Sequence, residues 1–139
     1  EILGSLFNQF MDVSEDVIAQ ELYMTLDQMK LMKNQGMLFG IHGYSHMWMD
    51  HMNRNELITE IEKALSAMDS LVDKDNWMIS YPYGGYTSET IKIVKELGGK
   101  IGVTVETRKV DVSNDNNLIL PRLDANDLPP KSCNYLNIK

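Results

Sequence analysis

The chain has 139 residues, which is enough for one domain with a buried core, and its 43% apolar content excludes wholesale disorder. Thirteen Lys and Arg against 20 Asp and Glu give a net charge of -7, so neither nucleic acid nor an anionic membrane surface is an expected partner. No apolar run reaches membrane-spanning length and no signal peptide is visible, which is compatible with both the cytoplasm and the cell envelope. The single cysteine, Cys133, excludes an intrachain disulfide and is expected to be inert.

The first part of the chain carries helical signals. Apolar residues between positions 2 and 11 recur with helical spacing. Thr25 has the character of an N-cap, with Gln28 three residues later as its capping-box partner. The helix that begins there is predicted to end at Gly36, because glycine favours the left-handed conformation that terminates helices.

A short apolar run at residues 37–41 is predicted to be a buried strand, and a helix is predicted over residues 54–72. Apolar residues at helical spacing are expected to face the core: Leu57, Ile61, Ala64, Leu65, Met68 and Leu71. Charged residues are expected to face solvent: Glu56, Glu60, Glu62 and Lys63.

Strands and one more helix complete the predicted elements. A strand at residues 77–81 ends in a turn at residues 82–85, and Thr87 caps a helix that closes at Gly98 and Gly99. Further strands are predicted at residues 101–105 and 118–120. Helices that alternate with short buried strands predict an α/β fold with parallel pairing, in which sites lie at the C-terminal ends of strands.

Two histidines, His42 and His46, follow the first predicted strand at a spacing of four residues. Neutral imidazoles at this spacing can share one metal ion, and zinc, iron, cobalt and nickel all suit them. The spacing alone favours structural or exposed histidines, because such a short motif has many false positives. Its context favours a metal site, since the pair follows a strand and Gly43 permits a sharp turn between the two histidines.

Several segments resemble the NodB-type polysaccharide deacetylases of carbohydrate esterase family four. The sequence from Phe39 to His46 resembles their second motif, H-[ST]-x-x-H, and residues 23–36 resemble the helix before it. Residues 79–86, with Tyr-Pro-Tyr-Gly, resemble the third motif, and residues 120–124 resemble a late Leu-Pro-Arg segment. The region around Trp48 is similar to members encoded with bacterial surface polysaccharides.

The resemblance implies an irregular (β/α) barrel that hydrolyses N- or O-acetyl groups on a sugar or polysaccharide precursor with a divalent metal, zinc above others. It implies that His42 and His46 hold this metal together with an aspartate. That aspartate and the general base belong to an Asp-Asp motif that this chain lacks. We therefore expect residues 1–139 to be a single deacetylase domain without its first strand, inactive and a poor metal binder alone.

The third motif departs from the family pattern. Ser80 occupies the position of an arginine that orients the catalytic base, and Arg122 is a candidate substitute, because a guanidinium can hold a carboxylate in a fixed geometry. Arg122 is equally well explained by an ion pair with Asp124. The late histidine that serves as general acid in the family is absent, because no histidine follows His51.

Further candidates for substrate contacts are Pro82, Tyr83 and Trp48. The resemblance assigns the backbone N–H of Tyr83, which follows Pro82, to the oxyanion, although Tyr83 could instead pack at the barrel rim. Trp48 could stack on a sugar ring, although packing in a core or interface is the commoner fate of such a residue. His51 is expected at the surface.

Two other functions remain open from the sequence. The first is a catalytically inactive carbohydrate- or partner-binding domain on the same fold, which Ser80 and the missing late histidine both favour. The second is an α/β domain with two structural histidines. A barrel without its first strand would expose apolar edges through which copies could associate, so a homo-oligomer is a further possibility.

Overall fold

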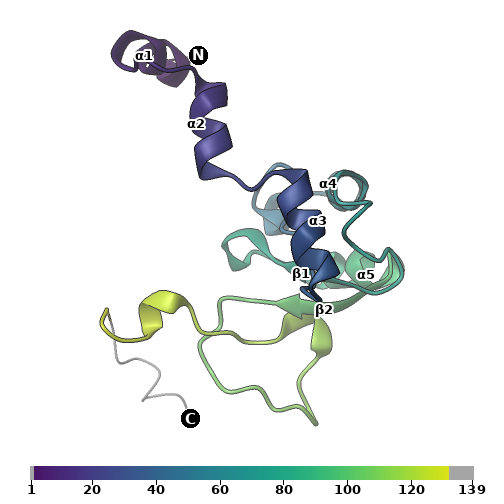
Figure 1. Cartoon of the computed structure of the whole chain (residues 1–139). Helices are drawn as coiled ribbons and strands as arrows, with labels where there is room; N and C mark the ends of the chain where they lie inside the picture. The colour runs from purple at the N-terminus through teal and green to yellow at the C-terminus, as the bar shows by residue number, and fades with distance from the viewer. Residues whose placement is uncertain (1, 132–139) are drawn as a thin grey trace. The chain divides into compact units, whose positions relative to one another are not determined.

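The structure is a computed structural model that describes residues 2–131 and divides the chain into two compact units, Glu1–Met37 and Leu38–Lys139. Cys133 lies outside the described residues. The described part of the first unit holds three helices: α1 (Ile2–Phe10), α2 (Glu15–Leu22) and α3 (Leu26–Asn34) (Figure 1). No helix within residues 2–131 combines the length and the apolar character that crossing a bilayer requires.

Local capping explains where the helices of the first unit begin and end. The Gln28 N–H donates to Thr25 Oγ1 at 3.2 Å and the Thr25 N–H donates to Gln28 Oε1 at 2.8 Å, so the predicted capping box is confirmed. Gly36 adopts φ 89°, which confirms the predicted end of α3. Helix α2, capped by Ser14, was not predicted, because its short sequence has little apolar periodicity.

The second unit holds a small parallel sheet with helices. Its main elements are α4 (Arg54–Ala67), β1 (Trp77–Ser80), α5 (Ser88–Glu96) and β2 (Gly99–Val103). Four short 3-10 helices, η1 to η4, lie at Met49–His51, Pro82–Gly84, Asn117–Ile119 and Ala125–Asp127. Strands β1 and β2 pair in parallel, and single bridges add Ile41 beside Ile79 and Leu120 beside Val103. The predicted parallel pairing is confirmed.

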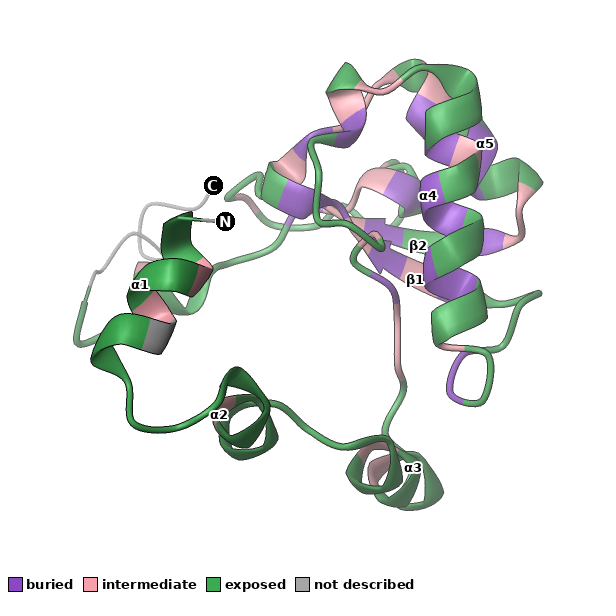
Figure 2. Ribbon diagram, turned by 90° about the horizontal axis from the view of Figure 1, so that it is seen from above, coloured by how far each residue is buried: buried purple, intermediate pink, exposed green. Residues whose placement is uncertain are grey.

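The core of this unit lies between the strands and the inner faces of α4 and α5, where the buried residues gather in Figure 2. Helix α4 contacts α5, and α5 contacts β2. The predicted stripe of α4 and the turn after it is confirmed, because Leu57, Ile61, Ala64, Leu65 and Leu71 are buried and Met68 is half-buried. Glu60 was predicted to face solvent, and this is wrong, since only 7% of the residue is exposed.

Other boundaries also differ from the predictions. Only Ile41 of residues 37–41 is buried and bridged, whereas Met37 and Leu38 are 54% and 91% exposed. A strand forms only where the backbone N–H and C=O groups find hydrogen-bond partners on an adjacent strand, and an apolar composition does not provide these partners. The segment predicted as a strand at residues 118–120 is mostly a 3-10 helix that leaves only Leu120 to bridge, and α4 ends at Ala67 instead of residue 72.

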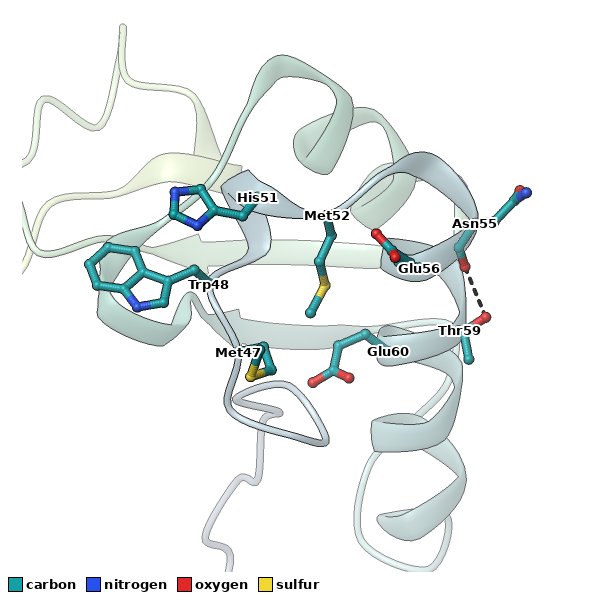
Figure 3. Close-up of a pocket in the computed structure, with 8 residues that line it drawn as sticks. All are labelled: Met47, Trp48, His51, Met52, Asn55, Glu56, Thr59 and Glu60. Atoms are coloured by element: carbon teal, nitrogen blue, oxygen red, sulfur yellow. Dashed lines mark hydrogen bonds between the residues drawn. The ribbon is translucent and has the colours of Figure 1, made fainter.

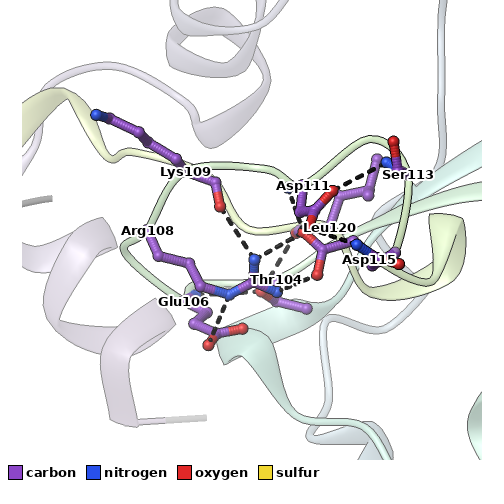
Figure 4. A network of polar contacts seen from close by, with 9 residues as sticks. Thr104, Glu106, Arg108, Lys109, Asp111, Ser113, Asp115 and Leu120 are labelled. Carbon is purple, nitrogen blue, oxygen red and sulfur yellow. Dashed lines mark hydrogen bonds and ion pairs between the residues drawn. The ribbon is translucent and has the colours of Figure 1, made fainter. Parts of the chain in front are cut away.

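An ion-pair network orders the loop between β2 and Leu120 (Figure 4). Arg108 donates from Nη1 and Nη2 to the two carboxylate oxygens of Asp115, at 2.7 and 2.8 Å, and its Nε lies 3.0 Å from Glu106 Oε1. The Asp111 N–H also donates to Asp115, at 2.8 Å. The hydrogen bond from Arg108, followed by that from Asp111, holds the pKa of Asp115 below its ordinary value.

Candidate metal centre

His42 stands directly after the point where the chain joins the edge of the sheet. The Ile41 N–H donates to the Met78 carbonyl at 2.9 Å, and the Ser80 N–H donates to the Ile41 carbonyl at 3.0 Å. These bonds bring the ring of His42 to the end of β1, where Nδ1 lies 2.6 Å from the Ser80 carbonyl oxygen. A carbonyl only accepts, so Nδ1 carries the proton and Nε2 of the neutral ring presents a lone pair.

His46 is brought back to His42 by a tight loop. Gly43 has φ 73° and His46 itself has φ 56°, a conformation that non-glycine residues seldom adopt. The two Nε2 atoms lie 3.1 Å apart, and His46 Nδ1 lies 3.1 Å from the hydroxyl of Tyr83. Both rings therefore have Nδ1 engaged with a partner while their Nε2 atoms converge.

The converging nitrogens fit a shared metal ion. Two ligands at zinc–nitrogen distances of 2.0–2.1 Å in a tetrahedral site lie about 3.3 Å apart, close to the separation seen between the Nε2 atoms. A carboxylate, a backbone carbonyl or a water is the usual partner of the other ring nitrogen in a metal-binding histidine, and the Ser80 carbonyl beside His42 is of this kind. Within residues 2–131 no cluster of three or more His, Cys, Asp or Glu side chains is suited to a metal, so the described part supplies two candidate ligands, His42 and His46.

Glu60 of α4 holds the loop between the two histidines. Its Oε1 accepts the N–H groups of Tyr44 and Ser45, both at 2.6 Å, and its Oε2 accepts the Ser45 hydroxyl at 2.8 Å. Sequence reasoning missed this residue, although a signal existed. Glu60 is three residues after Leu57 and four before Ala64, which puts its carboxylate on the buried face of the helix.

Tyr83 and Trp48 form an aromatic wall beside the histidines. Tyr83 lies in η2 with φ 55°, and its ring stacks on Trp48 with centroids 4.5 Å apart and planes 8° apart. The rings of Trp48 and His51 are also nearly parallel, at 5.9 Å. Trp48 borders a cavity of about 540 Å³ whose lining is drawn in Figure 3: Met47, Trp48, His51, Met52, Asn55, Glu56, Thr59 and Glu60.

In the described part of the chain, Arg122 and Asp124 make no hydrogen bond or ion pair with the two histidines. Asp124 caps η4 by accepting the Asn126 N–H at 2.7 Å, which, as the largest cause, lowers the pKa of Asp124. No ion pair joins Arg122 to Asp124 within residues 2–131, and the Arg122 N–H donates to the Glu106 carbonyl at 3.1 Å. Ser80 Oγ is buried, with no hydrogen-bond partner among the described residues.

Comparison with known proteins places the chain in a family. The sequence profile of the polysaccharide deacetylases matches residues 11–102, which include both histidines and the turn at Pro82. YxkH of Bacillus subtilis (strain 168), named among the polysaccharide deacetylases, is 28% identical over 89 residues, covering 64% of this chain and 32% of that protein.

Two solved structures are similar in fold. One is the Streptococcus pyogenes deacetylase PplD in complex with acetate, with a TM-score of 0.71 and 29% identity over 86% of this chain and 52% of that one. The other is IcaB from Ammonifex degensii, with a TM-score of 0.58 and 19% identity over 79% of this chain and 50% of that one. The chain thus spans about half the length of these structures and a third of YxkH. It belongs to the polysaccharide deacetylase family.

Proposed function

We propose that this chain forms the metal-binding part of a metal-dependent deacetylase, which hydrolyses N- or O-acetyl groups on a bacterial surface polysaccharide or its precursor. The observation that carries the proposal is the convergence of His42 Nε2 and His46 Nε2 to 3.1 Å, with both Nδ1 atoms held by partners. Family membership supports the reaction class, and the donor set supports zinc.

In this proposal His42 and His46 hold the metal, which when bound would supply Lewis-acid chemistry at the acetyl carbonyl. The Ser80 carbonyl orients His42, and the Tyr83 hydroxyl orients His46. Pro82 fixes the turn that presents the backbone N–H of Tyr83. That N–H makes no hydrogen bond in the described part of the chain, so it is available to the developing oxyanion.

We further propose that residues 1–139 belong to one irregular (β/α) barrel whose first strand, third ligand and general base lie outside this chain. The family profile runs from residue 11 to residue 102 across both compact units, which supports a single domain. Ile41 pairs with β1 through its own N–H and C=O groups. The backbone groups of Gly40 and His42, on the other edge, make no hydrogen bond within residues 2–131, so this edge could accept a further strand or a second copy.

The proposed substrate contact is made by Trp48. It is 45% exposed and borders the cavity of about 540 Å³, a volume in the range of small-molecule sites. The flat indole would present a stacking surface to a sugar whose acetyl group reaches the histidines. Arg122 and Asp124 stay candidates for orienting the base, but no contact to the histidines supports either role.

A second candidate function is a binding domain without catalysis. It is favoured by Ser80 at the position of the family's arginine, where the buried Oγ has no hydrogen-bond partner among the described residues. Such a domain would hold acetylated carbohydrate without hydrolysing it.

A titration of the chain with zinc and then acetate, followed by NMR, tests the proposed site. Zinc should shift the ring signals of His42 and His46 together and leave those of His51 unchanged. Acetate, the product of deacetylation, should then shift the Tyr83 amide in the presence of zinc and not in its absence. The variant His42→Ala should lose both responses, whereas His51→Ala should keep them. Zinc shifts that persist in His42→Ala would contradict the metal site, and an acetate response that does not need zinc would contradict the proposed metal dependence.

A further inference from the structure

The loop that separates the two histidines is held by one buried carboxylate. Glu60 is 7% exposed and accepts three hydrogen bonds from Tyr44 and Ser45, at 2.6, 2.6 and 2.8 Å. No other hydrogen bond engages the backbone of residues 43–46 in the described part of the chain. The loop backbone therefore depends on this side chain for its position.

The loop backbone packs closely against the carboxylate of Glu60. Within residues 2–131 no ion pair reaches its carboxylate, so backbone N–H groups and a hydroxyl compensate its burial, in the way successive amides bind anions. A Cβ on Gly43 would lie 2.9 Å from Glu60 Oε1, so the backbone passes against the carboxylate at a residue that also needs φ 73°.

We propose that Glu60 is a positioning residue for the metal centre: it fixes residues 43–45 and thereby the convergence of His42 Nε2 and His46 Nε2. The proposal rests on the proposed metal site and adds the side chain that positions its two histidines. The chain reverses between the two rings through the positive φ angles of Gly43 and His46, and the bonds to Glu60 lie between these two residues. Because Glu60 belongs to α4, the loop is tied to a helix packed in the core.

The test compares zinc affinity with local order in four versions of the chain. Glu60→Ala removes all three acceptor contacts, and Glu60→Gln keeps the shape and one carbonyl acceptor. Leu65→Ala truncates another buried residue of α4 and makes no hydrogen bond to the loop, so it controls for lost stability. NMR would measure zinc binding at His42 and His46 and the hydrogen exchange of the Tyr44 and Ser45 amides, at a temperature where all four are folded.

We expect Glu60→Ala to bind zinc about 10-fold more weakly than the parent, the size typical for residues that orient metal ligands. Its Tyr44 and Ser45 amides should exchange faster, whereas Leu65→Ala should keep both properties. Glu60→Gln, which keeps one carbonyl acceptor, should bind zinc with an affinity between those of the parent and of Glu60→Ala.

Parental zinc affinity in Glu60→Ala would overturn the proposal, as would an equal loss in Leu65→Ala. If Glu60→Ala does not fold, Glu60→Gln decides: weaker zinc binding with faster exchange at Ser45 supports the proposal, and parental values overturn it. A parent chain whose histidine signals ignore zinc would instead overturn the proposed metal site itself, and with it the positioning role.

Discussion

The hydroxyl of Tyr83 lies 3.1 Å from Nδ1 of His46, on the opposite side of the imidazole from the nitrogen that faces His42. This contact joins the two motifs of the proposed site, since His46 belongs to the loop after Ile41 and Tyr83 to the turn after β1. The backbone of Tyr83 is the part that the sequence drew attention to, whereas the structure gives its side chain a contact as well.

Replacing Tyr83 with Phe removes this contact and keeps the aromatic ring that stacks on Trp48. We expect zinc affinity to fall by about 10-fold, because the ring of His46 loses the partner that orients it. Tyr44→Phe is a matched control, since Tyr44 is 60% exposed and contacts Glu60 through its backbone only. An equal effect of both substitutions in a zinc titration would contradict the role of the Tyr83 hydroxyl.

The chain by itself should bind zinc more weakly than micromolar and release no acetate from acetylated sugars. The reason is that residues 2–131 offer two metal ligands, while catalytic zinc sites use three protein ligands. Calorimetric titration with zinc or cobalt, together with an acetate-release assay, would check this. Micromolar or tighter binding combined with activity would show that the chain already contains the missing ligand and base.

Alanine at Gly43 should disturb the proposed metal site more than the strain at its positive φ alone explains. Gly43 and Gly36 both have positive φ, at 73° and 89°, but only at Gly43 would a new Cβ meet another group, Glu60 Oε1 at 2.9 Å. We expect strain of about 1 kcal/mol in each variant. Only Gly43→Ala should also weaken zinc binding, as measured by NMR titration. Unchanged zinc binding in Gly43→Ala would mean that the loop tolerates displacement of the carboxylate.

Two isoleucines on neighbouring strands should differ sharply in their contribution to stability. Ile79 in β1 is fully buried, whereas Ile101 in β2 is 42% exposed. Truncation of Ile79 to Ala should lower the free energy of unfolding by about 2–5 kcal/mol, through lost burial and the cavity left behind. Ile101→Ala should cost about 1 kcal/mol or less, because much of its side chain already contacts water. Urea denaturation measures the free energy of unfolding of both variants. Equal losses would contradict the greater burial of Ile79.

The ion pair between Arg108 and Asp115 should make stability depend on pH in the acid range. The hydrogen bond from Arg108 is the main cause that lowers the pKa of Asp115 from 3.8. A carboxyl with a lowered pKa in the folded state stabilises the fold above its unfolded pKa, and this contribution is lost as pH falls through the folded pKa. Asp115→Asn should therefore lower the melting temperature at pH 6, with a difference from the parent that shrinks below pH 4. A difference that does not change with pH would contradict the ionic origin.

Helix caps, helix ends and apolar stripes could be predicted from the sequence because they depend on residues a few positions apart in the chain. The capping box of Thr25 and Gln28, the helix end at Gly36 and the apolar stripe of α4 all follow from residues a few positions apart. The histidine spacing and the Tyr-Pro-Tyr-Gly turn likewise sufficed to indicate the family, which the profile match over residues 11–102 bears out.

What the sequence could not determine depends on contacts between distant segments. The run at residues 37–41 has the composition of a strand, yet only Ile41 finds a partner, because pairing requires another strand at the right place. The charge of Glu60 predicts a place in solvent, although its position in the helix lies on the apolar face. Burial is possible because three donors, 15 and 16 residues away in the chain, form hydrogen bonds with its carboxylate.

The sequence by itself therefore indicated the family, the choice of His42 and His46 as candidate metal ligands, and most helix ends, because each depends on residues close together in the chain. Only the tertiary structure shows that the two Nε2 atoms lie 3.1 Å apart. It also shows that Ser80 and Tyr83 contact the Nδ1 atoms and that Glu60 binds the loop between the histidines. The physical reason is that a metal site is defined by distances between side chains whose positions are set by packing across the fold, which no spacing along the chain encodes.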